Sequence, residues 1–391
     1  MNLLKHNMRA LFRFSFLFSF QPYYGVLILY FAHILHSYTL GTSVWAFVQI
    51  AQAALEIPTG VVSDRFGRVV SLQIGTLANL AALLIYALSP SYVLLLVGAA
   101  LQGLNLALFS GNNDALMYDS ARHAGEKEGF HHHYSKINIA MEVAGAISAI
   151  IGSILAAISY SLVLWISVVP QVLAMLVATT LIEPPRTTAL SGNILSHLGD
   201  VYRYYKKNAH LRMLSVASIM SEGIGGASWN MMPAYYQQYV PLSYVGSLRS
   251  ANYIWSTVGF RISGWFMKRF KPATILLVSE AYSRAVSFIA LAVSSVASPF
   301  IMAFHGLPYG PSDTAKQHLL HEEFTDAQRA TMASLNSLAS SGVYAAFLVL
   351  TGYLADKFSP RVSILVCNIC LLPVFFITRA TFRSKLNGNI K

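Results

Sequence analysis

Long apolar segments dominate this chain. Stretches of about 20 mostly apolar residues, the length that a helix needs to cross a bilayer, follow one another from Phe12 to Phe376 with brief polar breaks. Hydrophobic residues make up 55% of the 391 positions and charged residues only 11%, whereas an ordinary soluble domain has about 25% charged residues. The chain is therefore predicted to be a membrane protein with no room for a soluble domain.

The apolar runs predict twelve spanning helices, so the expected fold class is an all-α membrane protein. Their approximate bounds are 11–36, 41–62, 70–88, 92–117, 137–158, 160–182, 210–238, 243–267, 273–293, 297–315, 331–355 and 361–379. One long connection separates six helices from six. We expect an N-terminal six-helix bundle over residues 1–185, a cytoplasmic linker over 186–209 and a C-terminal six-helix bundle over 210–391.

The linker has the pattern of a helix that lies in the membrane interface. Apolar residues recur at helical spacing beside basic ones, namely Ile194, Leu198, Val201 and Tyr205 beside Arg203, Lys206 and Lys207. A helix of this kind buries its apolar face at the boundary between headgroups and acyl chains. Membrane lipids are therefore expected partners of the chain.

The net charge of +11 comes from basic residues that cluster in the connections and at both termini. Cytoplasmic connections carry an excess of Lys and Arg, and these clusters fall on one side if the chain starts inside. We expect a multi-pass protein of the inner (cytoplasmic) membrane with both termini cytoplasmic, and lipid headgroups rather than nucleic acid as partners. No small-residue cleavage site follows the first apolar run, so the first helix is expected to stay.

A short basic loop joins the second predicted span to the third. It reads Gly60-Val61-Val62-Ser63-Asp64-Arg65-Phe66-Gly67-Arg68, and a weaker copy, Gly264 to Phe270, follows the second span of the C-terminal half. The pattern resembles the signature loop of the major facilitator superfamily, a large class of twelve-helix secondary transporters. The resemblance implies two pseudo-symmetric halves, a solute site near the midplane and alternating access.

By this resemblance, the loop and the helix end before it form a cytoplasmic gate. Asp64 would pair near neighbouring helix ends, while Arg65 and Arg68 would hold ion pairs and lipid phosphate. A plain excess of positive charge on the inner side is the alternative, but it does not require two glycines and an acid at fixed spacing. The expected gate residues are Glu56, Gly60, Asp64, Arg65, Gly67 and Arg68, of which Glu56 could equally contact the solute.

Two patterns that drug and proton antiporters of the superfamily often carry are incomplete. Gln102-Gly103 is present, but Ala99 stands where those proteins often have Arg. Gly145 and Gly152 permit close helix approach but lack the proline of the fifth-helix motif. Drug antiport is therefore implied by the fold and not by these motifs.

Ionisable residues inside the predicted spans are candidates for proton coupling, because a charge near the membrane centre costs at least about 2.5–3.5 kcal/mol. Glu222 is our first choice, since it lies near the estimated midplane, and a purely structural hydrogen bond is the alternative for it. Glu280 and Arg284 stand one turn apart, and we expect a structural ion pair of Glu280 with Arg284 or Arg261 rather than a role in transport. The coupling candidates are Glu222, Glu142, Asp114 and His305.

Amide and aromatic residues on the predicted helices are candidates for the wall of a substrate cavity. Helix-to-helix hydrogen bonding is the alternative interpretation for the amides. The segment 210–238 combines three glycines with Pro233, so we expect this helix to be bent or interrupted at a solute site. The cavity candidates are Gln21, Tyr24, Gln49, Gln52, Asn105, Asn112, Trp229, Asn230, Asn252, Trp255, Tyr309, Asn336 and Tyr344.

The sequence thus predicts a proton-coupled secondary active transporter of a small, amphipathic organic solute that works as a monomer. Export of a drug, or of a secreted metabolite such as a siderophore, is favoured because the cavity candidates are rich in aromatic residues and poor in fixed charge. Import of a polar nutrient such as a sugar or amino acid by proton symport is the main alternative. A receptor, or a pore without coupled transport, is a more distant one.

No cofactor, metal site or enzymatic activity is expected. His131, His132 and His133 are consecutive, so they cannot all face one ion from a helix. Cys367 and Cys370 lie inside the last apolar span without flanking His ligands and are expected to pack. No nucleophile, base and anion-stabilising group occur together at a readable spacing.

Overall fold

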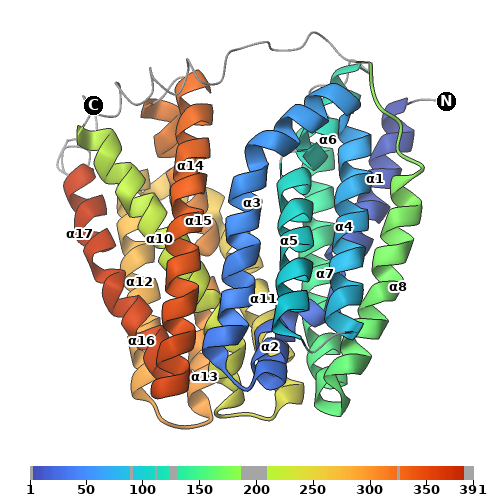
Figure 1. The fold of residues 1–391 in the computed structure, drawn as a ribbon. Coiled ribbons are helices and arrows are strands. Elements are labelled where there is room, and N and C mark those ends of the chain that lie inside the picture. Colours follow the sequence, from blue (N-terminus) through green and yellow to red (C-terminus); the bar gives the residue numbers. More distant parts are fainter. Residues whose placement is uncertain are drawn as a thin grey trace. The chain divides into compact units, whose positions relative to one another are not determined.

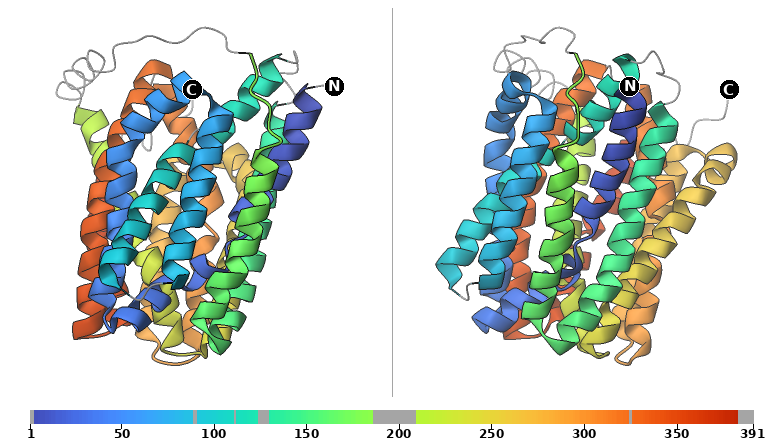
Figure 2. Two further views of the ribbon diagram at one scale, coloured as in Figure 1. Left: turned by 45° about the vertical axis from the view of Figure 1, so that its right-hand side comes forward. Right: turned by 90° about the vertical axis from the view of Figure 1, so that its right-hand side faces the viewer.

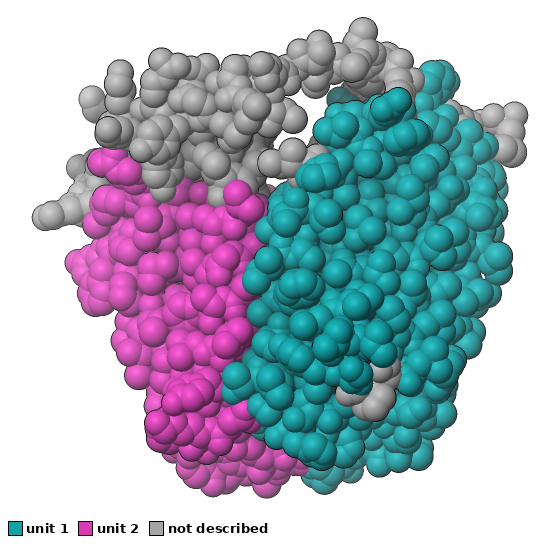
Figure 3. Space-filling view, in the orientation of Figure 1, with its two compact units in different colours: residues 1–190, 241–250 teal, residues 191–240, 251–391 magenta. Residues whose placement is uncertain are grey.

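A computed structural model describes residues 3–88, 91–110, 112–123, 130–185, 209–323 and 326–382. The described residues form helices and short connections. They fall into two compact units, which Figure 3 shows in two colours: unit 1 comprises residues 1–190 and 241–250, and unit 2 comprises residues 191–240 and 251–391. The predicted interfacial helix of the linker lies outside the described residues.

Unit 1 is a bundle of long helices whose labels appear in Figure 1. The helices α1, α4, α7 and α8 lie side by side, and α3 packs along α5 (Figures 1 and 2). The elements are α1 (Leu3–Ser19), η1 (Pro22–Val26), α2 (Leu27–Leu35), α3 (Tyr38–Phe66), α4 (Arg68–Leu88), α5 (Tyr92–Phe109), α6 (Asn112–His123), α7 (Phe130–Ile158) and α8 (Tyr160–Ala178), with the first residues of α11 (Leu242–Arg269).

Unit 2 contains the remaining helices. Its centre is the packing of α10 along α15 and α16, and α12 packs along α14. The elements are α10 (Ala209–Gln237), the rest of α11, α12 (Pro272–Ala292), α13 (Ala297–Ala303), η2 (Phe304–Gly306), α14 (Tyr309–Glu323), α15 (Asp326–Lys357), α16 (Pro360–Cys370) and α17 (Leu372–Thr381).

Each of the twelve predicted spans coincides with one helix or with a run of consecutive helices. By length and apolarity alone, eight helices among the described residues could cross a membrane. The number becomes nine if Tyr38–Glu56 and Pro58–Phe66, which meet at a bend of 54°, are counted as one span. Pro58 lies at this bend, as expected for a residue that cannot donate the next backbone hydrogen bond.

Some predicted spans are interrupted in the structure, but the segment 210–238, where we expected a bend or an interruption, is not one of them. The segment 210–238 forms one continuous helix, α10, with Pro233 inside it, so the expected interruption is wrong. Two of its three glycines lie close to α15: a Cβ on Gly223 would lie 2.7 Å from the Val343 side chain and one on Gly226 3.2 Å from the Tyr344 ring, whereas one on Gly225 would meet nothing within 4 Å. The first predicted span is interrupted at Pro22, and the tenth at the 3-10 turn η2.

Glycines let η1, α7 and the start of α11 approach at backbone distance in unit 1. A Cβ on Gly152 would lie 1.9 Å from the carbonyl oxygen of Pro22, and one on Gly246 would lie 1.9 Å from that of Ala149. A Cβ on Gly25 would lie 3.5 Å from the Cα of Ala149. We call these five residues the glycine seam.

The apolar core of unit 1 surrounds α1. Leu11, Phe14 and Phe18 are buried there among side chains of α4, α6, α7 and α8, and the Phe18 ring stacks on Phe109 with centroids 4.6 Å apart. In unit 2 a smaller cluster joins α10 to α15, α16 and α17 through Ile224 and Cys367. The packing predicted for Cys367 is therefore confirmed.

Candidate functional site

The glycine loop sits where α3 ends and α4 begins. Gly67 has a φ of 109°, a backbone conformation that glycine adopts easily and side chains with a Cβ do not. Its N–H donates to the carbonyl of Ser63 at 3.0 Å and closes α3, and α4 starts at the next residue. The second glycine of the loop is therefore required by backbone geometry, whereas a Cβ on Gly60 would meet nothing within 4 Å.

The basic residues of the loop have partners in unit 1. Arg68 Nε lies 2.9 Å from a carboxylate oxygen of Asp119 on α6, and both side chains are about one-third exposed. The Arg65 guanidinium lies over the Phe66 ring, 5.5 Å from its centroid. Because exposed ion pairs contribute little energy, the Arg68–Asp119 pair positions α4 against α6 more than it stabilises the fold.

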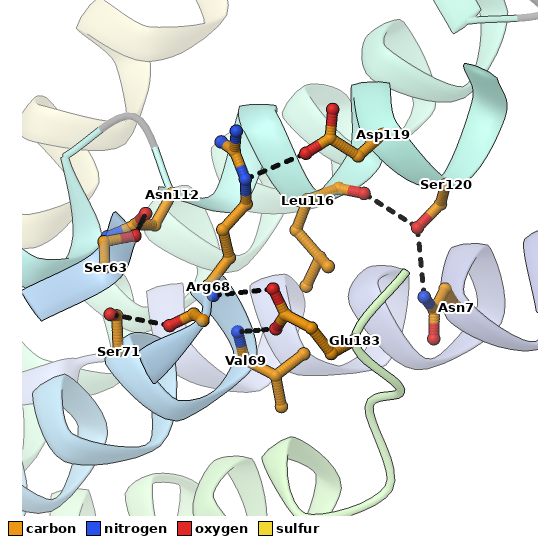
Figure 4. A network of polar contacts seen from close by, with 11 residues as sticks. Asn7, Ser63, Arg68, Val69, Ser71, Asn112, Leu116, Asp119, Ser120 and Glu183 are labelled. Carbon is orange, nitrogen blue, oxygen red and sulfur yellow. Dashed lines mark hydrogen bonds and ion pairs between the residues drawn. The ribbon is translucent and has the colours of Figure 1, made fainter. Parts of the chain in front are cut away.

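Glu183, in the connection after α8, binds the first turn of α4. The backbone N–H groups of Arg68 and Val69 donate to its two carboxylate oxygens at 3.0 and 2.8 Å. The first N–H groups of a helix lack intrahelical partners, and a negative charge there is favoured by the helix dipole. Figure 4 shows this contact beside the Arg68–Asp119 pair.

Asn7 of α1 holds the residue before Glu183. It is fully buried, donates from Nδ2 to the carbonyl of Ile182 at 2.8 Å and to Ser120 Oγ at 3.0 Å, and accepts from the N–H of Ile182 at 3.1 Å. We call Asn7, Arg68, Asp119, Ser120 and Glu183 the loop-end network (Figure 4). Sequence reasoning missed Asn7 and Glu183 as members, although a Glu at the end of an apolar span was a usable signal.

Replacing Glu183 by Ala is expected to destabilise unit 1 by about 1 kcal/mol, the typical cost of losing a helix cap. Unfolding of the purified protein by denaturant would measure it. The matched control is Asp119→Asn, which removes only an exposed ion pair worth about 0–1 kcal/mol. Equal losses in the two variants would contradict a special role for the bonds from Glu183 to the α4 backbone.

The other predicted residues near the loop divide into buried and exposed ones. Asn112 is buried at the start of α6, where it accepts from Ser63 Oγ and donates to the Leu108 carbonyl at 2.6 Å. Glu56 on α3 is half-buried, whereas Asp114 on α6 and Glu142 on α7 are exposed. Asn112 thus connects α6 to the loop.

Polar side chains also meet inside unit 1. Buried Gln102 accepts from the Tyr86 hydroxyl at 2.9 Å and donates to the Tyr23 hydroxyl at 3.2 Å, so it links α4, α5 and η1. Asn105, one turn along α5, is buried, and the oxygen of its side-chain amide accepts no hydrogen bond from the described residues. Among the other cavity candidates, Gln49 is buried, Gln21 and Gln52 are half-buried, and the Tyr24 ring packs edge-on against Trp45.

A hollow of about 530 Å³ lies at the opposite end of unit 1 from the loop. It is lined by residues of α2, α4, α7 and α8, including Tyr30, His33 and Tyr160. No residue of the predicted cavity wall lines it.

Glu222 lies near the middle of α10 and is held by three donors from unit 2. Lys316 of α14 donates to its Oε1 at 2.8 Å, Ser218 donates to the same oxygen at 2.9 Å, and Ser340 of α15 donates to Oε2 at 3.2 Å. Lys316 also donates to Ser218 Oγ at 3.0 Å. We call these four residues the Glu222 cluster; the Glu222 side chain is 47% exposed and that of Lys316 32%.

Further predicted residues extend the Glu222 cluster along the same faces of α10 and α15. Tyr344 follows Ser340 by one turn, receives a hydrogen bond from Asn230 Nδ2, and lies with its ring against Gly226. Asn336, one turn before Ser340, is half-buried. The structure therefore brings together Glu222, Asn230 and Tyr344, whereas the Trp229 ring packs edge-on against Tyr253.

The break between α13 and α14 collects another group. Asn252 of α11 donates to the Ala303 carbonyl at 3.3 Å, and the Trp255 ring lies 4.6 Å from that of Phe304. A Cβ on Gly306 would lie 2.4 Å from the Asn252 carbonyl oxygen, so the two backbones are in contact here. The Tyr309 ring packs edge-on against that of Phe260.

His305 lies in the same break, in η2, but interacts with a different group of residues. It interacts electrostatically with Arg284 of α12, and Arg284 interacts with Glu280 and donates to Asn368 of α16 at 2.8 Å. Glu280 also interacts electrostatically with Lys316. Among the described residues, Glu280 and Arg284 interact through their charges but form no close ion pair, so the predicted pair is not formed as expected.

Each of the two units contains long apolar helices, and a basic glycine loop joins α3 to α4 within unit 1. These features define a multi-pass membrane transporter. The sequence of residues 10–345 matches the family model of the Major Facilitator Superfamily. The chain belongs to the Major Facilitator Superfamily, and so to a family of transporters and not of enzymes. The resemblance inferred from the loop is confirmed.

Solved structures of the same fold cover almost the whole chain. The nucleoside transporter NupG is 14% identical with a TM-score of 0.77, covering 98% of this chain and 100% of that one. A bacterial homologue of the human lysosomal transporter Spinster, inward-facing and unoccupied, is 15% identical with a TM-score of 0.74, covering 100% and 99%. A D-xylose-proton symporter is 12% identical with a TM-score of 0.73, covering 96% of each. These similarities establish the twelve-helix fold, while a search of curated protein sequences finds no match.

Proposed function

We propose that the protein is a proton-coupled secondary active transporter of a small organic solute, in which Glu222 takes up and releases the proton. The observation that supports this most is the Glu222 cluster: a carboxylate halfway along the 29-residue helix α10, bound to an ammonium group and still about half exposed. Intramembrane ionisable residues of this kind mark ion and proton pathways in membrane proteins.

The ion pair gives Glu222 two distinct states. In the ionised state the carboxylate holds Lys316 by charge and accepts hydrogen bonds from Ser218 and Ser340. A proton on the carboxylate removes the attraction for Lys316, so the contact between α10 and α14 weakens. A proton can thereby bias which arrangement of unit 2 is populated, as a ligand does when it binds one state better.

The direction of transport remains a prediction. Export by antiport is supported by the aromatic rings beside the polar residues of unit 2, among them Trp229, Trp255 and Tyr344. Proton symport is the second candidate, and the cation of Lys316 beside Glu222 favours it, because a solute acceptor could bind while the proton is present. The D-xylose-proton symporter, a protein of the same fold, couples its solute to a proton in this direction.

The loop-end network is proposed as part of the gate on the cytoplasmic side. Arg68, Asp119 and Glu183 join α4 to α6 and to the end of α8. This assignment places both termini in the cytoplasm and the chain in the cytoplasmic membrane, as the distribution of basic residues predicts. The domain boundaries at 185 and 210 and a monomeric working state belong to the same proposal.

Reconstitution into liposomes that enclose a pH-sensitive dye tests the coupling. Uridine, D-xylose and ethidium are added outside in turn, and the dye reports whether a solute moves protons. We expect at least one solute to do so. Glu222→Gln is expected to abolish this proton movement while exchange of labelled solute between the two sides continues, because the amide resembles the protonated acid.

Glu142→Gln is the matched control, since Glu142 is a glutamate within the predicted fifth span and, unlike Glu222, has no hydrogen bond or ion pair with the described residues. It should leave the proton movement unchanged. Proton movement that persists in Glu222→Gln but is lost in Glu142→Gln would transfer the coupling role to α7. The sign of the dye signal separates symport from antiport.

A further inference from the structure

The ammonium group of Lys316 is only partly used. It has three N–H donors, and the described contacts take two of them, one to Glu222 at 2.8 Å and one to Ser218 at 3.0 Å. No described residue accepts the third. Because the side chain is 32% exposed, this donor is open to an acceptor that enters from outside the unit.

Glu222 is more fully used than Lys316. A carboxylate has about four acceptor sites, and the hydrogen bonds from Lys316, Ser218 and Ser340 take three of them. While Glu222 is ionised, the two charges of the pair offset one another, so charge favours neither a cationic nor an anionic solute. A proton on Glu222 leaves only the charge of Lys316, and the cluster is then prepared for an anionic acceptor.

We propose that Lys316 binds an acidic group of the solute, a carboxylate or a group of the same charge, and that this solute binds together with the proton on Glu222. The inference rests on the proposed role of Glu222. When a proton bonds to a Glu222 oxygen, Lys316 loses its counter-ion, and an unpaired charge away from water is strongly unfavourable. The anion restores the pair, and no proton passes to the solute.

The other charges around the pair leave Lys316 available. From α12, Glu280 interacts with both Lys316 and Arg284, so Arg284 already offsets its charge. On α14 itself, Asp313 stands one turn before Lys316. Titratable residues on the other helices include Tyr344 of α15, which bonds Asn230, and Cys367 of α16, which is buried against α10. The helix α17 packs against α10 through Val374 and Ile377.

The neighbourhood also suits the body of such a solute. The Tyr344 ring lies one turn from Ser340 and packs against Gly226, where no side chain covers the α10 backbone. An aromatic ring one turn along α15 from the Glu222 cluster fits a small amphipathic acid with an apolar part and one carboxylate. One proton and one monoanion together carry no net charge, so their symport would be insensitive to membrane potential.

Binding to the purified full-length protein tests the inference without any gradient. Acetate, lactate and benzoate are compared with acetamide, lactamide and benzamide by the shift in melting temperature. We expect at least one acid to bind roughly tenfold or more tightly than its amide, the range for a hydrogen bond to a charged group. With benzenesulfonate, which stays ionised, affinity should rise as the pH falls, because protonation of Glu222 releases Lys316.

Variants separate the roles of the two charges. Lys316→Gln should no longer bind acids more tightly than amides. Glu222→Gln should still prefer acids, but its affinity for benzenesulfonate should no longer depend on pH. If Lys316→Gln does not fold because Glu222 is left unpaired, the neutral double variant Glu222→Gln, Lys316→Gln replaces it and should also bind acids no better than amides. A preference for acids that survives in this double variant would overturn the assignment to Lys316.

Other outcomes are equally decisive. Failure of every acid to stabilise the wild type, or tighter binding of benzyltrimethylammonium than of benzoate, would overturn the anionic solute. Because these measurements need no proton movement, they can fail while the dye assay still shows coupling through Glu222. Conversely, acid binding that persists without any coupled proton movement would sink the proposed function and leave the Lys316 site standing.

Discussion

Gly152→Ala is expected to be among the most damaging single-methyl changes at the described glycines. The added carbon would lie 1.9 Å from the carbonyl oxygen of Pro22 and 2.8 Å from its carbonyl carbon. Backbone atoms cannot rotate away as a side chain can, so η1 and α7 would have to separate along the glycine seam. Overpacking typically costs about 1–3 kcal/mol and occasionally more, and this contact belongs at the upper end.

The melting temperature of the purified protein and its yield in folded form would measure the effect. Gly145→Ala on the same helix is the matched control, because a Cβ there meets nothing within 4 Å. That change should be neutral or stabilising by up to about 1 kcal/mol, since alanine favours a helix over glycine. Similar losses in both variants would mean that the seam is not tightly packed in the protein.

Asn7→Ala should produce the second large loss. The side chain is fully buried and makes three hydrogen bonds, two of them to the backbone of Ile182. Alanine leaves the part-buried N–H and C=O of Ile182 without these partners. An unsatisfied group costs about 1–3 kcal/mol when it is fully buried, and less when water reaches it. The expected total is roughly 2–4 kcal/mol, measured by denaturant unfolding.

Asn138→Ala is the control for this prediction. Asn138 also donates to a carbonyl, that of Tyr134 at 3.0 Å, but it is exposed and the bond stays within one helix. Its removal should cost less than about 0.5 kcal/mol, as for most surface changes. A small loss for Asn7→Ala would show that Ile182 finds other partners.

Sequence alone predicted the fold because its signals are local. Apolar runs locate the spans, and the loop motif depends on neighbouring residues, such as Gly67 with its positive φ between two helices. A hydropathy run does not register a break one turn long, which is why the interruption at Pro22 was missed. We expected the glycines of α10 to favour a bend or an interruption. Instead, Gly223 and Gly226 allow residues of α15 to pack close to the α10 backbone.

The partners within the candidate site could not be predicted in the same way. Glu222 was recognised because an acid in an apolar span is unusual, but its partner Lys316 lies 94 residues away along the chain. Glu183 and Arg68 are 115 residues apart. Periodicity shows which face of a helix a residue occupies, and not which helix lies opposite.

The carboxylate of Glu183 has a mechanical consequence for α4. The opening turn of a helix usually frays, because its amides have only water to bond, but here two of them are fastened to the residue that follows the sixth span. Asn7 anchors the adjoining peptide from the other side. The junction after the sixth span and the start of the third therefore move as one piece, so a pull on the chain beyond Glu183 would be transmitted directly to the glycine loop.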